Sequence, residues 1–121
     1  MEDGMEINGK ERHFEYLVKA YDDICALCPD EDMSRIGEKF SNPSESVDMA
    51  ISCAVILNKC YEDHQHHINP DYKPDYLTRE DFDYEPVSIM HEVTGEIMKA
   101  FREGNRQTVK TEPVNKKGKN A

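Results

Sequence analysis

The fold of this chain is decided by residues 42–66, which read NPSESVDMAISCAVILNKCYEDHQH and contain the longest apolar stretch, Met49 to Leu57. Its first residues favour a helix start. Asn42 can cap the free N–H groups, Pro43 suits the first helical position, and Glu45 can close a capping box. Apolar residues then recur every three or four positions, as in an amphipathic helix. The segment therefore predicts a long helix that starts after Asn42 and runs to about His66.

The apolar face of this predicted helix is unusually wide, at about 220° of the helical wheel. One stripe is the expected core face, and a second stripe flanks it, formed by Met49, Cys53, Ile56 and Cys60. Met and Cys are soft groups that adapt to many apolar surfaces. We therefore predict that the second stripe contacts a partner helix or a second copy of the chain. The alternative is that Phe40, Phe82 and the loop tyrosines cover it within the monomer.

The remaining signals predict a mainly α fold around this helix. Asn8-Gly9 favours a two-residue turn in an N-terminal β-hairpin, although a flexible leader is the alternative. The apolar spacing predicts helices over residues 16–28 and 85–103, with a short helix over 33–40 and a turn capped by Thr78 and Asp81. The fold class is thus a small domain of three main helices with short helical turns. The expected domain is 1–104, and the expected disordered tail is 105–121.

Charge and composition exclude several classes of protein. The 121 residues contain 25 Asp and Glu against 15 Lys and Arg, for a net charge of −10. The basic charges gather in the tail, so residues 1–104 are more acidic still. Such a protein is not expected to bind nucleic acid or an anionic membrane, because both need a basic face. We find no secretory leader and no apolar run near the roughly 20 residues that span a bilayer, so we expect a cytoplasmic protein with reduced thiols.

No arrangement of residues in the sequence is typical of an enzyme, and we expect no cofactor. The strongest metal pattern is a set of Cys and His residues that are the ligands structural zinc prefers: Cys25, Cys28, Cys60, His64, His66 and His67. However, Cys25-x-x-Cys28 falls near the end of a predicted helix and lacks the glycine turn of a zinc knuckle. We therefore expect no metal, and a small structural zinc module stays an alternative.

The order of elements resembles a known family. A leader with Ile-Asn-Gly-Lys-Glu (7–11) precedes an aromatic-aliphatic segment over 14–24, a long helix that opens Ser-Val-Asp-Met-Ala (46–50), the turn Leu-Thr-Arg-Glu-Asp-Phe (77–82), a last amphipathic helix and a polar tail. This order is similar to that of the tail assembly chaperones of long-tailed, siphovirus-like phages. The short second strand and the Tyr/Pro loop over 68–76 depart from the family pattern.

The resemblance implies a function without catalysis. Such chaperones bind the tape-measure protein in the host cytoplasm, keep it soluble and help tail-tube subunits to polymerise, and they are not expected in the mature virion. The family also often makes a longer form by programmed frameshifting, which the codons of Lys117-Gly118-Lys119 would permit. A homo-oligomer is compatible with this reading. The alternatives are an acidic inhibitor or DNA mimic, the zinc module, and another helical interaction module.

Overall fold

The computed structural model describes residues 4–106, and its first element is the hairpin that Asn8-Gly9 predicts. Strand β1 (Gly4–Ile7) pairs antiparallel with β2 (Lys10–His13). Asn8 and Gly9 have φ angles of 52° and 78°, so both lie in the left-handed region that a tight hairpin turn requires. The predicted hairpin is confirmed, and the predicted tail beyond residue 106 lies outside the described residues.

Helix α1 (Val18–Cys25) is shorter than the predicted helix over 16–28. The chain before it is extended, and Phe14 and Tyr16 turn the same way into the core because alternate residues of an extended chain share a face. This extended segment lies along the long helix, where Glu15 N donates to the carbonyl oxygen of Leu57 at 3.1 Å. After α1, Pro29 opens a 3₁₀ turn, η1 (Pro29–Glu31), in place of another helical turn.

The predicted short helix over 33–40 is present as a 3₁₀ turn, η2 (Met33–Arg35), continued by α2 (Ile36–Ser41). The long helix, α3 (Ser46–Ile68), begins later than its sequence signals indicate. The predicted capping box between Asn42 and Glu45 is wrong. Asn42 Oδ1 instead accepts hydrogen bonds from the Ser44 backbone and hydroxyl, which closes a separate turn before the helix.

The capping box predicted at Thr78 and Asp81 is confirmed, and it opens the 3₁₀ turn η3 (Arg79–Phe82). Helix α4 (Ile89–Gly104) follows. It starts one turn after the predicted residue 85, because residues 83–88 form turns that include the bond from Ile89 N to the carbonyl oxygen of Pro86, at 2.9 Å. Gly104 is its last residue, close to the predicted stop.

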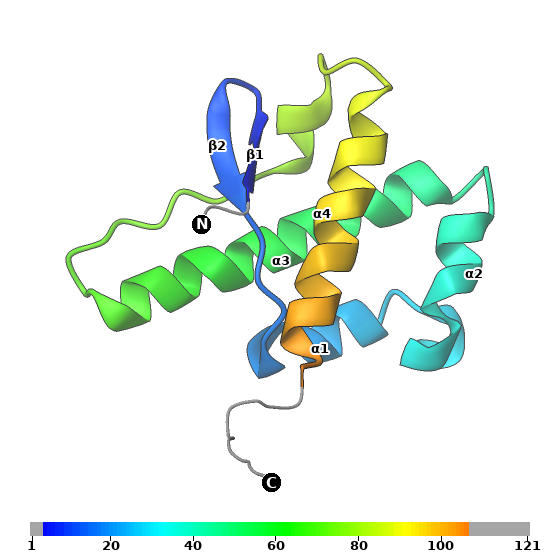
Figure 1. Cartoon of the computed structure of the whole chain (residues 1–121), viewed down its shortest axis with the longest axis horizontal. Coiled ribbons are helices and arrows are strands. Elements are labelled where there is room, and N and C mark those ends of the chain that lie inside the picture. The colour runs from blue at the N-terminus through cyan, green and yellow to red at the C-terminus, as the bar shows by residue number, and fades with distance from the viewer. Residues whose placement is uncertain (1–3, 107–121) are drawn as a thin grey trace, which may run out of the picture.

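The elements are arranged around α3, which runs through the middle of the molecule with α4 crossing it (Figure 1). The hairpin and η3 lie on one side of this crossing and α1 on the other, while α2 sits near the N-terminal end of α3. All of them contribute to one core, whose most buried side chains include Ile7, Ile24, Leu57, Leu77 and Ile97. The predicted mainly α fold class is therefore confirmed for the described residues.

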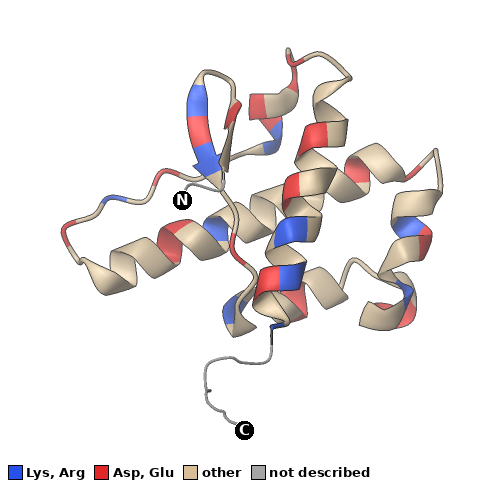
Figure 2. Ribbon diagram, viewed as in Figure 1, with Lys and Arg blue, Asp and Glu red and all other residues tan. Residues whose placement is uncertain are grey.

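Charged side chains are scattered over all of these elements (Figure 2). Lys and Arg residues lie among the acids, and many form ion pairs at the surface, such as Lys59 with Asp63 at 2.8 Å and Arg35 with Glu38 at 2.8 Å. No helix within residues 4–106 combines the length and the apolar character needed to cross a membrane.

Candidate partner-binding surface

The second stripe of α3, predicted to contact a partner, lies mostly in the core of the monomer. Met49, Cys53 and Cys60 are buried, with 4%, 0% and 2% of their surfaces exposed, and Ile56 is partly buried against the core. Helices α1, α2 and α4 all pack on α3. The prediction of a partner surface formed by Met49, Cys53, Ile56 and Cys60 is therefore wrong for the described fold. The apolar face of α3 is wide because other elements cover it on more than one side.

The cysteines of this region are buried thiols. Burial raises the pKa of Cys53 to about 12, and burial is also the main reason why the pKa values of Cys28 and Cys60 lie above the usual range. All four cysteines are unpaired, as expected of reduced thiols, and only Cys25 is more than slightly exposed. A thiol with a raised pKa holds little thiolate at neutral pH, so Cys28, Cys53 and Cys60 serve packing rather than nucleophilic chemistry.

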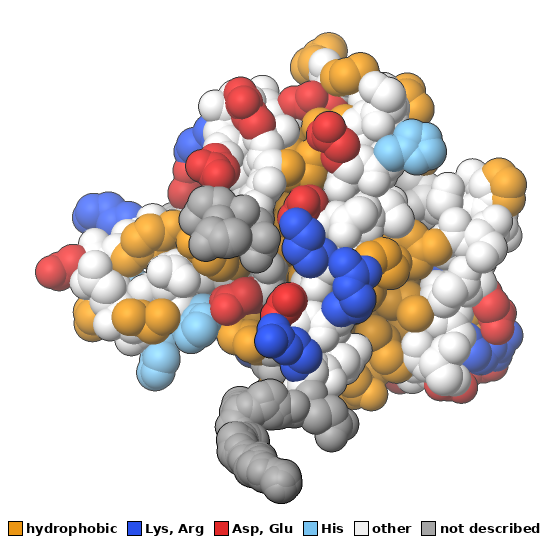
Figure 3. All heavy atoms as spheres, viewed as in Figure 1, with side chains coloured by type: hydrophobic (Ala, Val, Ile, Leu, Met, Phe, Trp, Pro, Cys, Tyr) orange, Lys and Arg blue, Asp and Glu red, His pale blue; other side chains and the backbone are white. Residues whose placement is uncertain are grey.

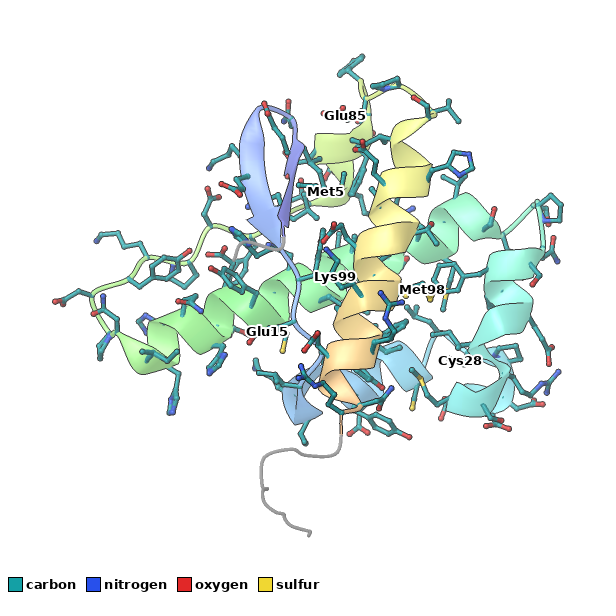
Figure 4. The ribbon with its side chains drawn as sticks, viewed as in Figure 1. Met5, Glu15, Cys28, Glu85, Met98 and Lys99 are labelled. Atoms are coloured by element: carbon teal, nitrogen blue, oxygen red, sulfur yellow. The ribbon has the colours of Figure 1, made fainter. Side chains whose placement is uncertain are left out.

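The residues of the zinc alternative are not assembled into a ligand set. His64 Nδ1 lies 2.8 Å from Glu15 Oε1, and Glu15 is labelled in Figure 4 beside α3. His66 Nδ1 lies 2.9 Å from the carbonyl oxygen of Tyr72, while Cys28 Sγ points to the carbonyl oxygen of Ile24 at 3.5 Å. Within residues 4–106, no group of three or more His, Cys, Asp or Glu side chains is placed to hold a metal ion.

An exposed apolar surface does exist, but at the start of α1. Leu17, Val18 and Tyr21 lie at the outer side of the first helical turn, with 38%, 91% and 45% of their surfaces exposed. They border a hollow of about 470 Å³ between α1 and the end of α4. We call these three residues and this hollow the α1 surface. Asp22 is the only charged residue that lines the hollow among those described.

The floor of the α1 surface is a tight junction between the extended segment and α4. The Tyr16 ring packs edge-on against Phe101, with 4.8 Å between ring centroids and an interplanar angle of 73°. Burial, more than any neighbouring charge, raises the pKa of Tyr16 to about 12. Gly104 lets the two backbones approach, because a Cβ at this position would lie 2.2 Å from the carbonyl oxygen of Tyr16. The hollow is thus bordered by aromatic and aliphatic groups on a fixed base.

This surface can take up an apolar side chain, and its residues offer no set of groups for acid, base or nucleophilic catalysis. Helix periodicity does not reveal this surface, because Leu17, Val18 and Tyr21 fit the apolar stripe of the predicted helix over 16–28. The sequence did offer one signal: this segment carries more apolar residues than one buried helix face needs, because Ala20 and Ile24 already form that face. In the described fold only the face of α1 with Ala20 and Ile24 is buried, and Val18 and Tyr21 are exposed.

Comparison of the chain with protein-family models, curated proteins and solved structures found no match in any of the three. The function is therefore inferred from the order of the elements and from the exposed surfaces alone.

Proposed function

We propose that this protein is a tail assembly chaperone of a long-tailed phage, which binds the tape-measure protein and keeps it soluble before tail assembly. The observation that carries the proposal is the α1 surface. It is a hollowed, exposed apolar site on an acidic protein, and Val18 is 91% exposed there. The order of hairpin, helices and turn in the described residues is also compatible with the family that the sequence resembles.

The physical role of the α1 surface would be to cover apolar side chains of a helical partner. A helix presents such side chains at positions i and i+3 or i+4, and they would enter the hollow of about 470 Å³ and contact Leu17 and Val18 at its border. Fully burying one large aliphatic side chain contributes about 1.5–3 kcal/mol. A few such contacts give a reversible complex, which suits a chaperone that must later release its partner.

The acidic body would keep the complex in solution. The whole chain carries a net charge of −10, and complexes that share this sign repel one another. The alternative of an acidic inhibitor or DNA mimic has less support, because acids that mimic a phosphate backbone should form rows. Here Lys and Arg interrupt the acids along the helices (Figure 2).

The test is co-expression of this chain with the tape-measure protein of the same genome. The soluble fraction of the tape-measure protein is measured with the wild-type chain, with Val18→Asp and with the control Val47→Asp. Both substitutions place an acid in the first turn of a helix, where the helix dipole favours it, so both variants should fold. Val47 is 46% exposed on α3, away from the α1 surface.

We expect the wild type and Val47→Asp to keep the tape-measure protein soluble, and Val18→Asp to lose most of this effect. A wild-type chain that leaves the tape-measure protein insoluble would contradict the proposed function. Equal solubilisation by all three chains would contradict the placement of the site on the α1 surface while leaving the function standing.

A further inference from the structure

The C-terminal end of α4 lies at the border of the α1 surface. Gly104 and Asn105 line the hollow, and the described residues end immediately after them, at Arg106. Figure 1 shows this end of α4 next to α1. Asn105 is itself fixed, because its N–H donates to the carbonyl oxygen of Phe101 at 3.0 Å. The chain that follows Arg106 therefore starts from a defined point beside the hollow.

The sequence after this point combines an apolar residue with positive charge. Residues 107–121 read QTVKTEPVNKKGKNA and contain four Lys against one Glu, whereas the whole chain has a net charge of −10. Val109 lies four residues after Asn105 and directly precedes Lys110. An extended chain spans at most about 3.6 Å per residue, so Val109 stays within about 14 Å of Asn105. The first apolar side chain of this segment is therefore within reach of the hollow.

Two hollows border the end of α4, and their charges differ. The hollow of the α1 surface has the acid Asp22 in its lining. The second hollow is lined by Met98, Phe101, Arg102, Glu103, Asn105 and Arg106, so it carries two Arg against one Glu. Figure 3 shows Lys and Arg side chains gathered over the C-terminal half of α4. A segment with four Lys is repelled by the second hollow and attracted by Asp22, so charge favours the α1 surface.

We propose that residues 108–110 of the same chain occupy the α1 surface in the free protein, with Val109 in the hollow and Lys110 beside Asp22. The hollow of about 470 Å³ falls within the range of about 300–1,000 Å³ that is usual for ligand pockets, so it can hold a short peptide segment. This segment would also cover Val18, which is otherwise 91% exposed. A short tether gives an effective concentration on the order of millimolar, so even a weak contact forms within one chain.

The segment would act as a built-in competitor for the site, and this role rests on the proposed function. A helix of the tape-measure protein would have to displace Val109 before it binds, and the covered surface would meanwhile not attach to unrelated apolar proteins. The contact itself involves this chain alone and needs no tape-measure protein for its test. The contact and the proposed function can therefore fail separately.

The experiment is nuclear magnetic resonance spectroscopy on the isotope-labelled full chain. Nuclear Overhauser effects between the Val109 methyl groups and the side chains of Leu17 and Tyr21 report the contact directly. The test variant is Val109→Asp, and the matched control is Val114→Asp. Both add one acid to the same segment, so they change its charge equally and differ in which valine is lost. Neither position contributes to the core of residues 4–106, so both variants should fold, and their amide spectra verify this.

We expect these Overhauser effects in the wild type and in Val114→Asp, with the same relative intensity at every protein concentration. In Val109→Asp the amide signals of Leu17, Val18 and Tyr21 should shift, while in Val114→Asp they should stay at their wild-type positions. Absence of the effects in the wild type, or equal amide shifts in both variants, would overturn the proposal. Contacts from Val109 to Met98 would also overturn it, because they place the segment in the second hollow. Effects that disappear on dilution would do the same, because they place it on a second copy.

Discussion

The buried Asn58 in the middle of α3 offers the sharpest test of how this fold is held together. Its side chain is fully buried, and its amide makes two hydrogen bonds to other elements. Asn58 Nδ2 donates to the carbonyl oxygen of His13 at 3.0 Å, at the end of β2. Asn58 Oδ1 accepts from Leu77 N at 2.8 Å, where the chain returns from the loop over 69–78. One side chain therefore ties the hairpin and this loop to the central helix.

Replacing Asn58 with Ala removes both bonds at a site that water does not reach. The Leu77 N–H loses its partner while buried, at a cost of about 1–3 kcal/mol, and loss of the bond to His13 adds about 1 kcal/mol. We therefore expect the free energy of unfolding to fall by about 2–4 kcal/mol.

The assay is urea unfolding followed by circular dichroism at 222 nm, with Lys59→Ala as the matched control. Lys59 is the next residue of α3, and its side chain, which pairs with Asp63 at 2.8 Å, is 55% exposed. Its loss should therefore cost less than about 1 kcal/mol. If Asn58→Ala destabilises the protein no more than Lys59→Ala does, the reasoning that the buried amide holds these elements together is refuted.

Three further predictions concern the contact between Gly104 and Tyr16, the loss of stability at low pH, and the reactivity of the cysteines. Gly104→Ala should lower the free energy of unfolding by about 1–3 kcal/mol in urea titrations, because its Cβ would meet a backbone oxygen at 2.2 Å; the control Gly95→Ala has open space and should be neutral or stabilising by up to about 1 kcal/mol. Burial alone would raise the pKa of Asp63, but hydrogen bonds from neighbouring lysine and tyrosine side chains lower it to about 2. The stability it contributes is therefore complete above about pH 4 and is lost as the pH falls through 2, so Asp63→Asn should show a shallower loss between these values in unfolding titrations; an unchanged slope would contradict this. In the native protein Ellman's reagent should modify Cys25 first and leave Cys53 unmodified until the chain unfolds, and rapid reaction of Cys53 would disprove its burial.

The sequence predicted those parts of the fold that depend on local chemistry. Asn8-Gly9 supplies the left-handed turn of the hairpin, and Thr78 and Asp81 supply a capping box, so neighbouring residues alone specify both features. Periodicity also located α3 and α4. The start of α3 was misplaced because the Asn42 side chain has two uses of similar stability, a helix cap and a tight turn, and local sequence does not choose between them.

The candidate site could not be predicted in the same way, because burial depends on which elements pack together. The pattern at Met49, Cys53 and Cys60 correctly identified an apolar face but did not reveal that this face is buried within the described fold. Conversely, the apolar spacing around Val18 predicts a buried residue. Val18 is nevertheless exposed, because the chain is extended through Tyr16 and the helix begins only at Val18. Tertiary packing, rather than helix periodicity, thus decided which apolar residues reach the surface.

Site-specific photo-crosslinking tests the central claim most directly, because it reports contact at the α1 surface itself. A photoreactive phenylalanine analogue is placed at position 18 in one sample and at position 47 in another, and each chain is co-expressed with the tape-measure protein and irradiated. Val18 and Val47 are both exposed valines in the first turn of a helix, so the two samples differ chiefly in the surface that carries the probe. We expect a covalent adduct with the tape-measure protein from position 18 and little or none from position 47. Equal adducts from both positions, or none from position 18, would contradict a tape-measure-binding role for this surface.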